Sequence, residues 1–174
     1  NEYFVLMLGA GLAASVIEES PRSVKNVLGF GAYVIAAFKE TLLRKRSLYR
    51  IALDARPPIS VRGSALFVVN LGRLPGREIG IAPDASGRDG LVDIVVIKTK
   101  TLFHSAAVFA QLLIGRRPDY HQYQSHRASD VQIESRRPES VQLDGDLAGK
   151  TPVRVRVLPG AVRVFISRDV IADI

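Results

Sequence analysis

The chain has 174 residues, of which 47% are hydrophobic and 24% charged, and it contains no cysteine. This length suffices for one globular domain with its own core, and the composition excludes disulfides and thiolate metal sites. The net charge of +7 favours an anionic partner. We expect phosphate or an anionic membrane surface and no nucleic acid, because no basic stripe is interleaved with aromatic residues.

The first part of the chain predicts a strand, a glycine turn and a long helix. Residues 3–8 are apolar and predict a buried strand, and Gly9-Ala10-Gly11 predicts a tight turn. A dinucleotide fingerprint would need a helix opening directly on these glycines, whereas the helix over residues 20–43 begins only at Ser20-Pro21. Basic residues at its end suit the helix dipole or, alternatively, a docking patch for anionic lipid headgroups: Lys39, Arg44, Lys45 and Arg46.

The rest of the chain predicts mainly strands. The apolar period changes to two from Leu48, and residues 65–69 are fully apolar, which indicates a strand buried on both faces. A second helix is predicted over residues 101–113. The further predicted strands are residues 48–53, 59–71, 91–97, 120–126, 130–135, 141–143, 153–158 and 162–166. We therefore predict a single domain over residues 1–174, mainly β (α+β), built as an antiparallel β-sandwich with two helices.

Two carboxylates flank a glycine in Asp144-Gly145-Asp146. In an extended segment, residues i and i+2 point to the same side, so this pair could share a metal ion, a proton or an attacking hydroxyl group. Asp-Gly between apolar strands is also the strongest short signal for a hairpin turn. On the residues alone, both interpretations stay open.

Two further acidic places qualify as candidates. Asp89-Gly90-Leu91, with Asp93 two residues later, could hold a hard cation through a carboxylate, backbone carbonyls and waters, or it could be another Asp-Gly turn. Asp84 follows Pro83 in the preceding loop.

Several segments occur together in a characteristic order: Tyr3-Phe4, Gly9-x-Gly11, Ser20-Pro21 and the helix after it, Asn70-x-Gly72-Arg73, Ile81-Ala82-Pro83-Asp84-Ala85, Asp89-Gly90-Leu91-x-Asp93, Asp144-Gly145-Asp146 and Leu158-Pro159-Gly160-Ala161. This ordered set, which covers nearly the whole chain, resembles the C-terminal domain of the diacylglycerol kinase-like lipid kinases. That family comprises bacterial diacylglycerol kinases, with sphingosine kinases as more distant relatives. The resemblance implies a sandwich of the type that diacylglycerol kinases share with NAD kinases.

The resemblance also implies a reaction and roles for three residues. The family transfers the γ-phosphoryl group of ATP to a lipid hydroxyl with the help of Mg²⁺. By this resemblance Asp144 would be the general base, Asp146 would order magnesium or the nucleotide, and Asn70 would contact the cofactor. Asp146 stands where the family usually shows Glu.

A structural magnesium ion is implied as well, held by Asp89 and the backbone carbonyls of Ser86 and Leu91. The chain begins Asn-Glu-Tyr-Phe without an initiator Met, and we expect a piece of a longer two-domain kinase whose nucleotide-binding half lies elsewhere. On its own the piece is expected to be inactive. The expected partners are a lipid substrate, an anionic membrane surface and a possible homodimer, and the expected location is cytoplasmic and peripheral at the membrane.

Two other functions remain open from the residues. One is a soluble kinase of the NAD kinase type. The other is a non-catalytic membrane or protein interaction module, in which the basic helix end would matter and the carboxylates would not.

Overall fold

The computed structural model describes residues 2–11, 46–74, 77–78, 81–82, 84–99, 111 and 123–163. The two predicted helices lie outside these ranges except for Gln111, which is helical. The basic end of the first helix also lies outside them apart from Arg46, whose Nη1 donates to the carbonyl of Lys98 at 3.4 Å. Within the described residues, no helix is long and apolar enough to cross a membrane.

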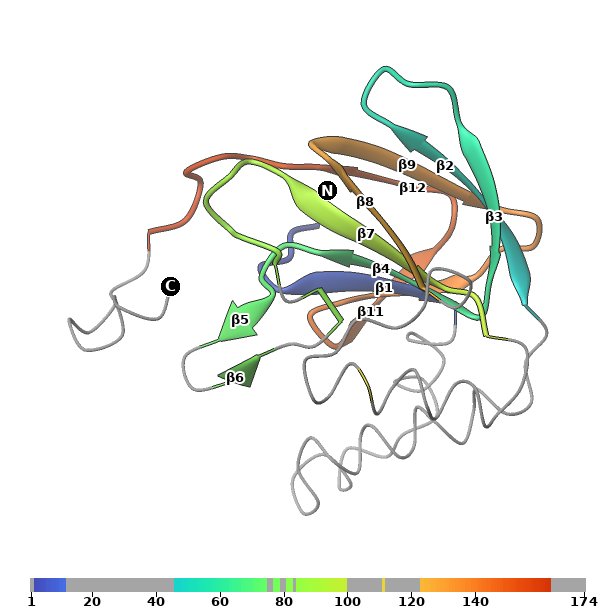
Figure 1. Cartoon of the computed structure of the whole chain (residues 1–174), viewed down its shortest axis with the longest axis horizontal. Coiled ribbons are helices and arrows are strands. Elements are labelled where there is room, and N and C mark those ends of the chain that lie inside the picture. The colour runs from blue at the N-terminus through green and yellow to red at the C-terminus, as the bar shows by residue number, and fades with distance from the viewer. Residues whose placement is uncertain are drawn as a thin grey trace, which may run out of the picture.

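The described residues form two main antiparallel sheets, as predicted (Figure 1). The six-stranded sheet has the order β11-β10-β1-β4-β7-β8, with strands β1 (Met7–Gly11), β4 (Ala65–Val69), β7 (Val92–Ile97), β8 (Tyr123–Ala128), β10 (Ser140–Leu143) and β11 (Asp146–Lys150). The four-stranded sheet has the order β12-β9-β2-β3, with strands β2 (Ser47–Leu53), β3 (Ile59–Gly63), β9 (Asp130–Ser135) and β12 (Val153–Arg156). A small ribbon of β5 (Arg73–Leu74) and β6 (Arg77–Glu78) follows β4.

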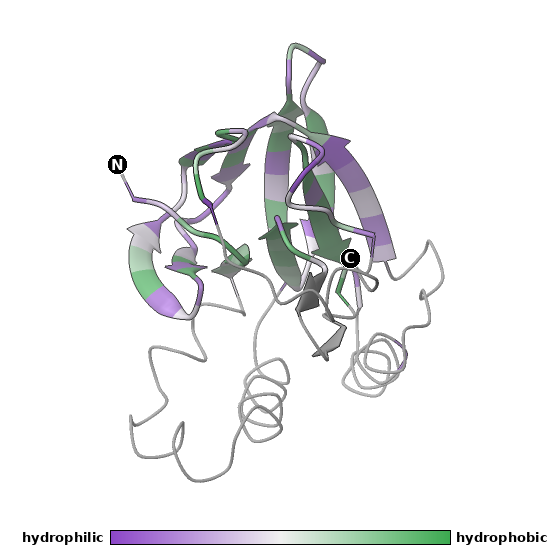
Figure 2. Cartoon of the chain, turned by 90° about the vertical axis from the view of Figure 1, so that its left-hand side faces the viewer, coloured by the Kyte–Doolittle hydropathy of each residue, from purple (hydrophilic) through white to green (hydrophobic). Residues whose placement is uncertain are grey.

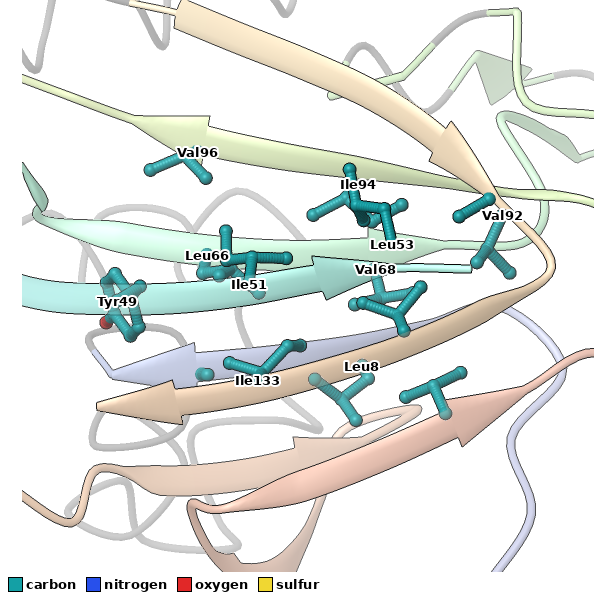
Figure 3. Close-up of a cluster of buried hydrophobic side chains, with 14 of the residues drawn as sticks. Leu8, Tyr49, Ile51, Leu53, Leu66, Val68, Val92, Ile94, Val96 and Ile133 are labelled. Atoms are coloured by element: carbon teal, nitrogen blue, oxygen red, sulfur yellow. The ribbon is translucent and has the colours of Figure 1, made fainter. Parts of the chain in front are cut away.

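The main hydrophobic core lies between the two sheets (Figure 3). Alternate residues of a strand point to opposite faces, so the central strands contribute every second side chain to the core. Val92, Ile94 and Val96 of β7 meet Ile51 and Ile133 of the four-stranded sheet, and all five side chains are at most 2% exposed. The same alternation colours the strands of Figure 2 in hydrophobic and hydrophilic bands. Burial of this layer is the main source of stability in such a fold.

The six-stranded sheet has a second apolar face. Phe67 and Val95 point away from the main core and pack in one cluster with Ala82 and Ala85, which precede β7 in the chain. All residues of β4 are therefore buried, as its uninterrupted apolar run predicted. Asp93 of β7 lies on this second face by strand alternation, and it is only 8% exposed.

At two corners the chain passes from one sheet to the other over a single residue. Ser64 separates β3 from β4, and Ser129 separates β8 from β9. The prediction of one continuous strand over residues 59–71 is therefore wrong, because its two halves pair in different sheets. The Ser64 backbone N–H and hydroxyl both donate to the carbonyl of Ile97, at 2.7 and 3.1 Å, and fix the first corner.

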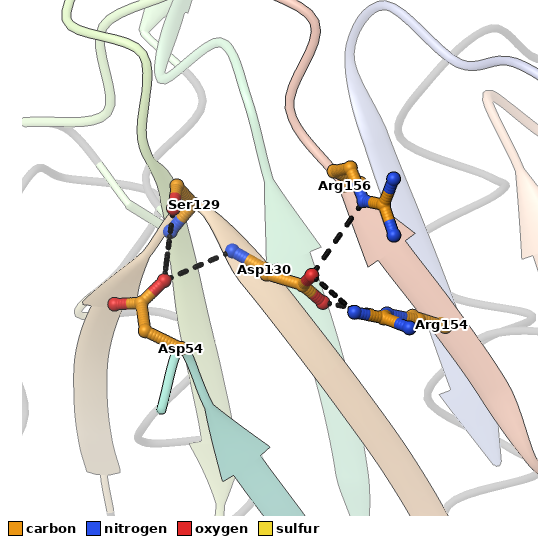
Figure 4. Close-up of polar contacts among 5 residues, drawn as sticks. All are labelled: Asp54, Ser129, Asp130, Arg154 and Arg156. Atoms are coloured by element: carbon orange, nitrogen blue, oxygen red, sulfur yellow. Dashed lines mark hydrogen bonds and ion pairs between the residues drawn. The ribbon is translucent and has the colours of Figure 1, made fainter. Parts of the chain in front are cut away.

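A polar cluster holds the second corner (Figure 4). Asp54 Oδ1 accepts hydrogen bonds from the N–H and hydroxyl of Ser129 and from the N–H of Asp130, at 2.9 to 3.1 Å. These bonds, first among them the one from the Ser129 backbone, hold the pKa of Asp54 below its usual value. Asp130 in turn accepts two hydrogen bonds from Arg154, at 2.9 and 2.6 Å, and lies 3.5 Å from Arg156 Nε.

Other predicted elements also differ from the structure. Gly9 lies inside β1, paired with Phe67 and Gln142, so the predicted turn is wrong there and only Gly11, with φ of 73°, leaves the extended region. The first strand begins at Met7 and not at residue 3. Strand β11 was not predicted, because Asp-Leu-Ala-Gly-Lys has no apolar alternation. Residues 162–163, the described part of the last predicted strand, belong to no strand.

Candidate functional site

The candidate residues gather at one end of the six-stranded sheet. In an antiparallel sheet, the end of one strand lies beside the beginning of its neighbour. One end of this sheet is therefore formed by the last residues of β10, β4 and β8 and the first residues of β1 and β7. Asp144 follows β10, Asn70 follows β4 and Asp89 precedes β7. Three candidate residues from distant parts of the sequence therefore lie at the same end of the sheet.

Asp144 is the first residue of the two-residue turn that joins β10 to β11. Its φ of 48° and the φ of 100° at Gly145 are both positive, as a tight hairpin turn of the Asp-Gly type requires. The local signal for a hairpin is thus confirmed. The alternative of one extended segment does not apply, because Asp144 and Gly145 lie in the turn and only Asp146 lies in a strand.

The carboxylate of Asp144 binds the backbone at the start of β1. Its Oδ1 accepts hydrogen bonds from the N–H groups of Leu6 and Met7, both at 2.9 Å, and its Oδ2 accepts one from Val5 at 2.7 Å. The Asp144 N–H also donates to the carbonyl of Met7 at 3.0 Å. A carboxylate offers about four lone-pair positions, so the described residues leave one position on Oδ2 without a donor.

Asn70 binds the same segment from the other side. Its Nδ2 donates to the carbonyl of Val5 at 2.7 Å, and its backbone N–H donates to the carbonyl of Leu6 at 2.8 Å. Asp144 and Asn70 therefore both bind the backbone of residues 5–7, which is the segment that leads into β1 and is called the entry to β1 below. The structure brings these two predicted site residues together around one short piece of backbone.

Asp146 lies on β11, the outermost strand of the six-stranded sheet. It begins β11 opposite Leu143 and is exposed. Cross-strand partners share a face, so its side chain is on the Leu143 side of the sheet. Asp146 is next to the Asp144 turn in sequence, and it offers an accessible carboxylate there.

The Asp89 loop is closed by contacts within the protein. Asp89 Oδ1 accepts the N–H of Leu91 at 2.9 Å, and Oδ2 accepts a hydrogen bond from Arg127 Nη2. The carbonyl of Ser86 accepts the Asp89 N–H at 3.5 Å. Each Asp89 carboxylate oxygen and one of the two carbonyls of the implied magnesium site thus already has one partner within the protein. In the part of the chain that the structure describes, no three His, Cys, Asp or Glu residues are grouped to hold a metal ion. The magnesium site stays a prediction, and the positive Arg127 guanidinium on the same carboxylate disfavours a divalent ion there by charge.

Arg127 also contacts Asp93. Its Nε lies 3.5 Å from Asp93 Oδ2, which is an ion-pair distance. This oxygen is buried and accepts no hydrogen bond from the described residues. Burial raises the pKa of the Asp93 carboxyl, the positive charge of Arg127 opposes this rise, and the negative charge of Asp89 adds to it. Arg127 was not among the residues predicted from the sequence. Its only signal was its place opposite Asp93 in the β7–β8 register, which a single sequence does not reveal.

The two carboxylate sites are separate. Asp93 on β7 and the Asp144 turn after β10 have β4 and β1 between them. Three strand spacings, about 14 Å, therefore separate strand β7 from strand β10.

The described residues define a mainly β domain of the sandwich type, with two packed antiparallel sheets. Residues 7–166 match the family described as the YegS C-terminal NAD kinase beta sandwich-like domain, and the chain belongs to this family. The match confirms the predicted resemblance to the C-terminal halves of diacylglycerol kinases.

Individual relatives agree with this assignment. The chain is 26% identical over 167 residues to the uncharacterized protein sll0036 of Synechocystis, covering 92% of this chain and 38% of that protein. It is 24% identical over 170 residues to a diacylglycerol kinase of Staphylococcus epidermidis, covering 98% of this chain and 53% of the kinase. The chain thus spans about half of the length of the Staphylococcus kinase and a smaller share of the length of sll0036.

Solved structures show the same fold. A candidate diacylglycerol kinase of Bacillus anthracis superimposes with a TM-score of 0.76 at 21% identity, covering 97% of this chain and 54% of that chain. A second diacylglycerol kinase structure from the same organism gives a TM-score of 0.65 at 16% identity, covering 97% and 51%.

Proposed function

We propose that this chain is the C-terminal half of a lipid kinase that transfers the γ-phosphoryl group of ATP to the hydroxyl of a diacylglycerol-like lipid. Membership of the family and the diacylglycerol kinase among its relatives support the substrate class. Coverage of about half of that relative supports a second half that carries most of the nucleotide site. By this proposal the chain alone does not turn over substrate.

The observation that carries the proposal is the binding of the Asp144 carboxylate. Three backbone N–H groups hold it in one orientation, and the remaining lone pair of Oδ2 is available to accept a proton. Phosphoryl transfer relies mainly on positioning and charge neutralisation, with a carboxylate to orient the attacking hydroxyl and take its proton. A base fixed by the backbone meets this need without ordering a mobile side chain during the reaction.

Asp146 and Asn70 complete the proposed site. Bound MgATP supplies the phosphoryl group and neutralises its charge. The exposed Asp146 carboxylate has the hard oxygen atoms that Mg²⁺ prefers, so it fits a role in orienting the ion or the nucleotide. Asn70 fixes the entry to β1 through Val5, and its Oδ1 is the atom that we assign to contact with the nucleotide.

The membrane is part of the proposal because the substrate is a lipid. A net charge of +7 favours a peripheral position on an anionic membrane surface, where basic residues gain free energy from the negative potential. This attraction predicts weaker vesicle binding at high salt.

The test uses the intact protein that carries this sequence, assayed with ATP, Mg²⁺ and diacylglycerol in mixed micelles. Asp144→Asn keeps the size of the side chain but removes the base, and we expect kcat to fall by a factor of at least about 100. Asp54→Asn is the matched control. Asp54 is also an aspartate with positive φ, 52°, whose carboxylate accepts three hydrogen bonds, but it lies on the four-stranded sheet at the Ser129 corner.

The two variants separate chemistry from folding. We expect Asp54→Asn to retain kcat at temperatures where the protein remains folded. Retained turnover in folded Asp144→Asn would remove Asp144 from its role. Phosphorylation of NAD in place of diacylglycerol would overturn the lipid kinase assignment.

A further inference from the structure

We propose that the guanidinium of Arg127 is the resident cation of the Asp89 loop and occupies the role that a divalent metal ion would otherwise have there. Arg127 Nη2 donates to Asp89 Oδ2, and Nε lies 3.5 Å from Asp93 Oδ2. One side chain thus connects the loop before β7 with β7 itself. The inference does not depend on the proposed kinase reaction.

The sheet register places Arg127 for this role. Arg127 of β8 is directly opposite Asp93 of β7, and cross-strand partners share a face. That face is the second apolar face of the six-stranded sheet, on which Asp93 is nearly buried. Asp89 lies four residues before Asp93 in sequence and meets the same guanidinium from the loop. The fork of the guanidinium suits two carboxylates better than a lysine ammonium would.

Charge balance requires a cation at this place. Asp89 and Asp93 are two carboxylates around one small site, with the Asp93 side chain only 11% exposed. A buried carboxylate without a compensating charge is costly. Arg127 supplies this charge and leaves little room for a second cation, because a divalent ion on Asp89 would lie next to the positive guanidinium. The Leu91 N–H bond to Asp89 Oδ1 occupies part of the remaining coordination.

The experiment measures the melting temperature Tm of the intact protein in EDTA and in millimolar MgCl₂, without ATP. We expect no stabilisation by Mg²⁺ through Asp89 in the wild-type protein. A metal site filled at about a hundred times its Kd would instead raise Tm by roughly 5–10 °C in a domain of this size. Arg127→Gln should have a lower Tm than wild type in EDTA. Its Tm should also rise with Mg²⁺, because the carboxylates of Asp89 and Asp93 are then free to bind the ion. The double variant with Asp89→Asn should lose this gained response.

Arg154→Gln is the matched control for the lost charge. Arg154 also pairs with a carboxylate, that of Asp130, but on the four-stranded sheet. Its variant should show no gained response to Mg²⁺. For a readout that does not depend on melting, Mn²⁺ binding followed by electron paramagnetic resonance should be equal in wild type and Asp89→Asn.

Four results would overturn the proposal. The first is a rise in wild-type Tm with Mg²⁺ that is lost in Asp89→Asn. The second is wild-type Mn²⁺ binding that depends on Asp89. The third is Arg127→Gln as stable as wild type in EDTA, and the fourth is a folded Arg127→Gln that is insensitive to Mg²⁺. None of these readouts uses kinase activity, so failure here leaves the proposed function standing, and loss of the proposed function leaves this result standing.

Discussion

Replacing Asp144 by Asn should loosen the entry to β1 as well as remove the proposed base. The amide has one acceptor oxygen where the carboxylate has two. At least one of the N–H groups of Val5, Leu6 and Met7 therefore loses its partner, and the others bond to a neutral acceptor. A hydrogen bond to a charged group contributes about 1.5–3 kcal/mol and a neutral one about 0.5–1.5 kcal/mol. Because Asp144 is exposed and water can replace lost contacts, we expect a loss of about 1–3 kcal/mol in the free energy of unfolding.

Urea denaturation of the wild type, Asp144→Asn and Asp144→Ala measures this loss, and the order of stability should follow the number of acceptors left. Amide hydrogen exchange provides the local readout, because Leu6 and Met7 should exchange faster in both variants. Asp54→Asn should leave these two amides unchanged. It perturbs the Ser129 corner in the other sheet.

Either of two results would contradict this prediction. A loss within the roughly 0.5 kcal/mol of an ordinary surface substitution would mean that the three hydrogen bonds do not anchor β1. Unchanged exchange at Leu6 and Met7 would mean the same, whatever happens to global stability. Such a result would also make Asp144→Asn a pure test of the catalytic proposal.

Three further predictions concern the core, the loop after β4 and the dependence of stability on pH. Ile133→Ala should cost about 2–5 kcal/mol in urea denaturation because Ile133 is fully buried, and a cost under about 1 kcal/mol would contradict the described core. Gly72→Ala should lower Tm, since its Cβ would lie 2.0 Å from the carbonyl oxygen of Ala82, and an unchanged Tm would show that this loop packs otherwise. Asp54 has a lowered pKa in the folded state, led by its bond to the Ser129 backbone, so its contribution is full above the unfolded pKa of about 4 and is lost as pH falls through the folded value. The stability difference between wild type and Asp54→Asn should therefore be constant near neutral pH and shrink in acid, and a difference that grows in acid would have the wrong sign.

Strands with a clear apolar pattern could be predicted from the sequence. Val131 and Ile133 alternate with polar residues, and β9 has the bounds that the alternation indicated. The pattern could not show that the chain changes sheets at Ser64, because residues on both sides of Ser64 have strand-forming sequences. It also misplaced Gly9, which is a common turn residue but lies here in the middle of β1.

The candidate site was predictable in its residues but not in its contacts. Asp144 and Asn70 were found from motifs, yet neither motif shows that both bind the backbone of residues 5–7. The partner of Asp89 could not be found at all, since Arg127 is 38 residues away in sequence and is brought close only by the pairing of β7 with β8. Long-range register is the information that a single sequence lacks.

The two interpretations of Asp144-Gly145 turn out to describe one structure. A two-residue turn forces Asp144 into a positive φ, and this conformation turns its carboxylate back onto the start of β1. Among the described residues, the same contacts leave a single lone pair of Oδ2 without a donor. In the proposed function this lone pair accepts the proton of the substrate hydroxyl, and a phosphoryl donor has to be brought to the same place. Near Asp144 the described residues contribute the exposed Asp146 carboxylate and the Asn70 amide, while the Gln142 amide oxygen accepts the Gly145 N–H. The proposed function therefore assigns most of the phosphate binding to a second half of the enzyme.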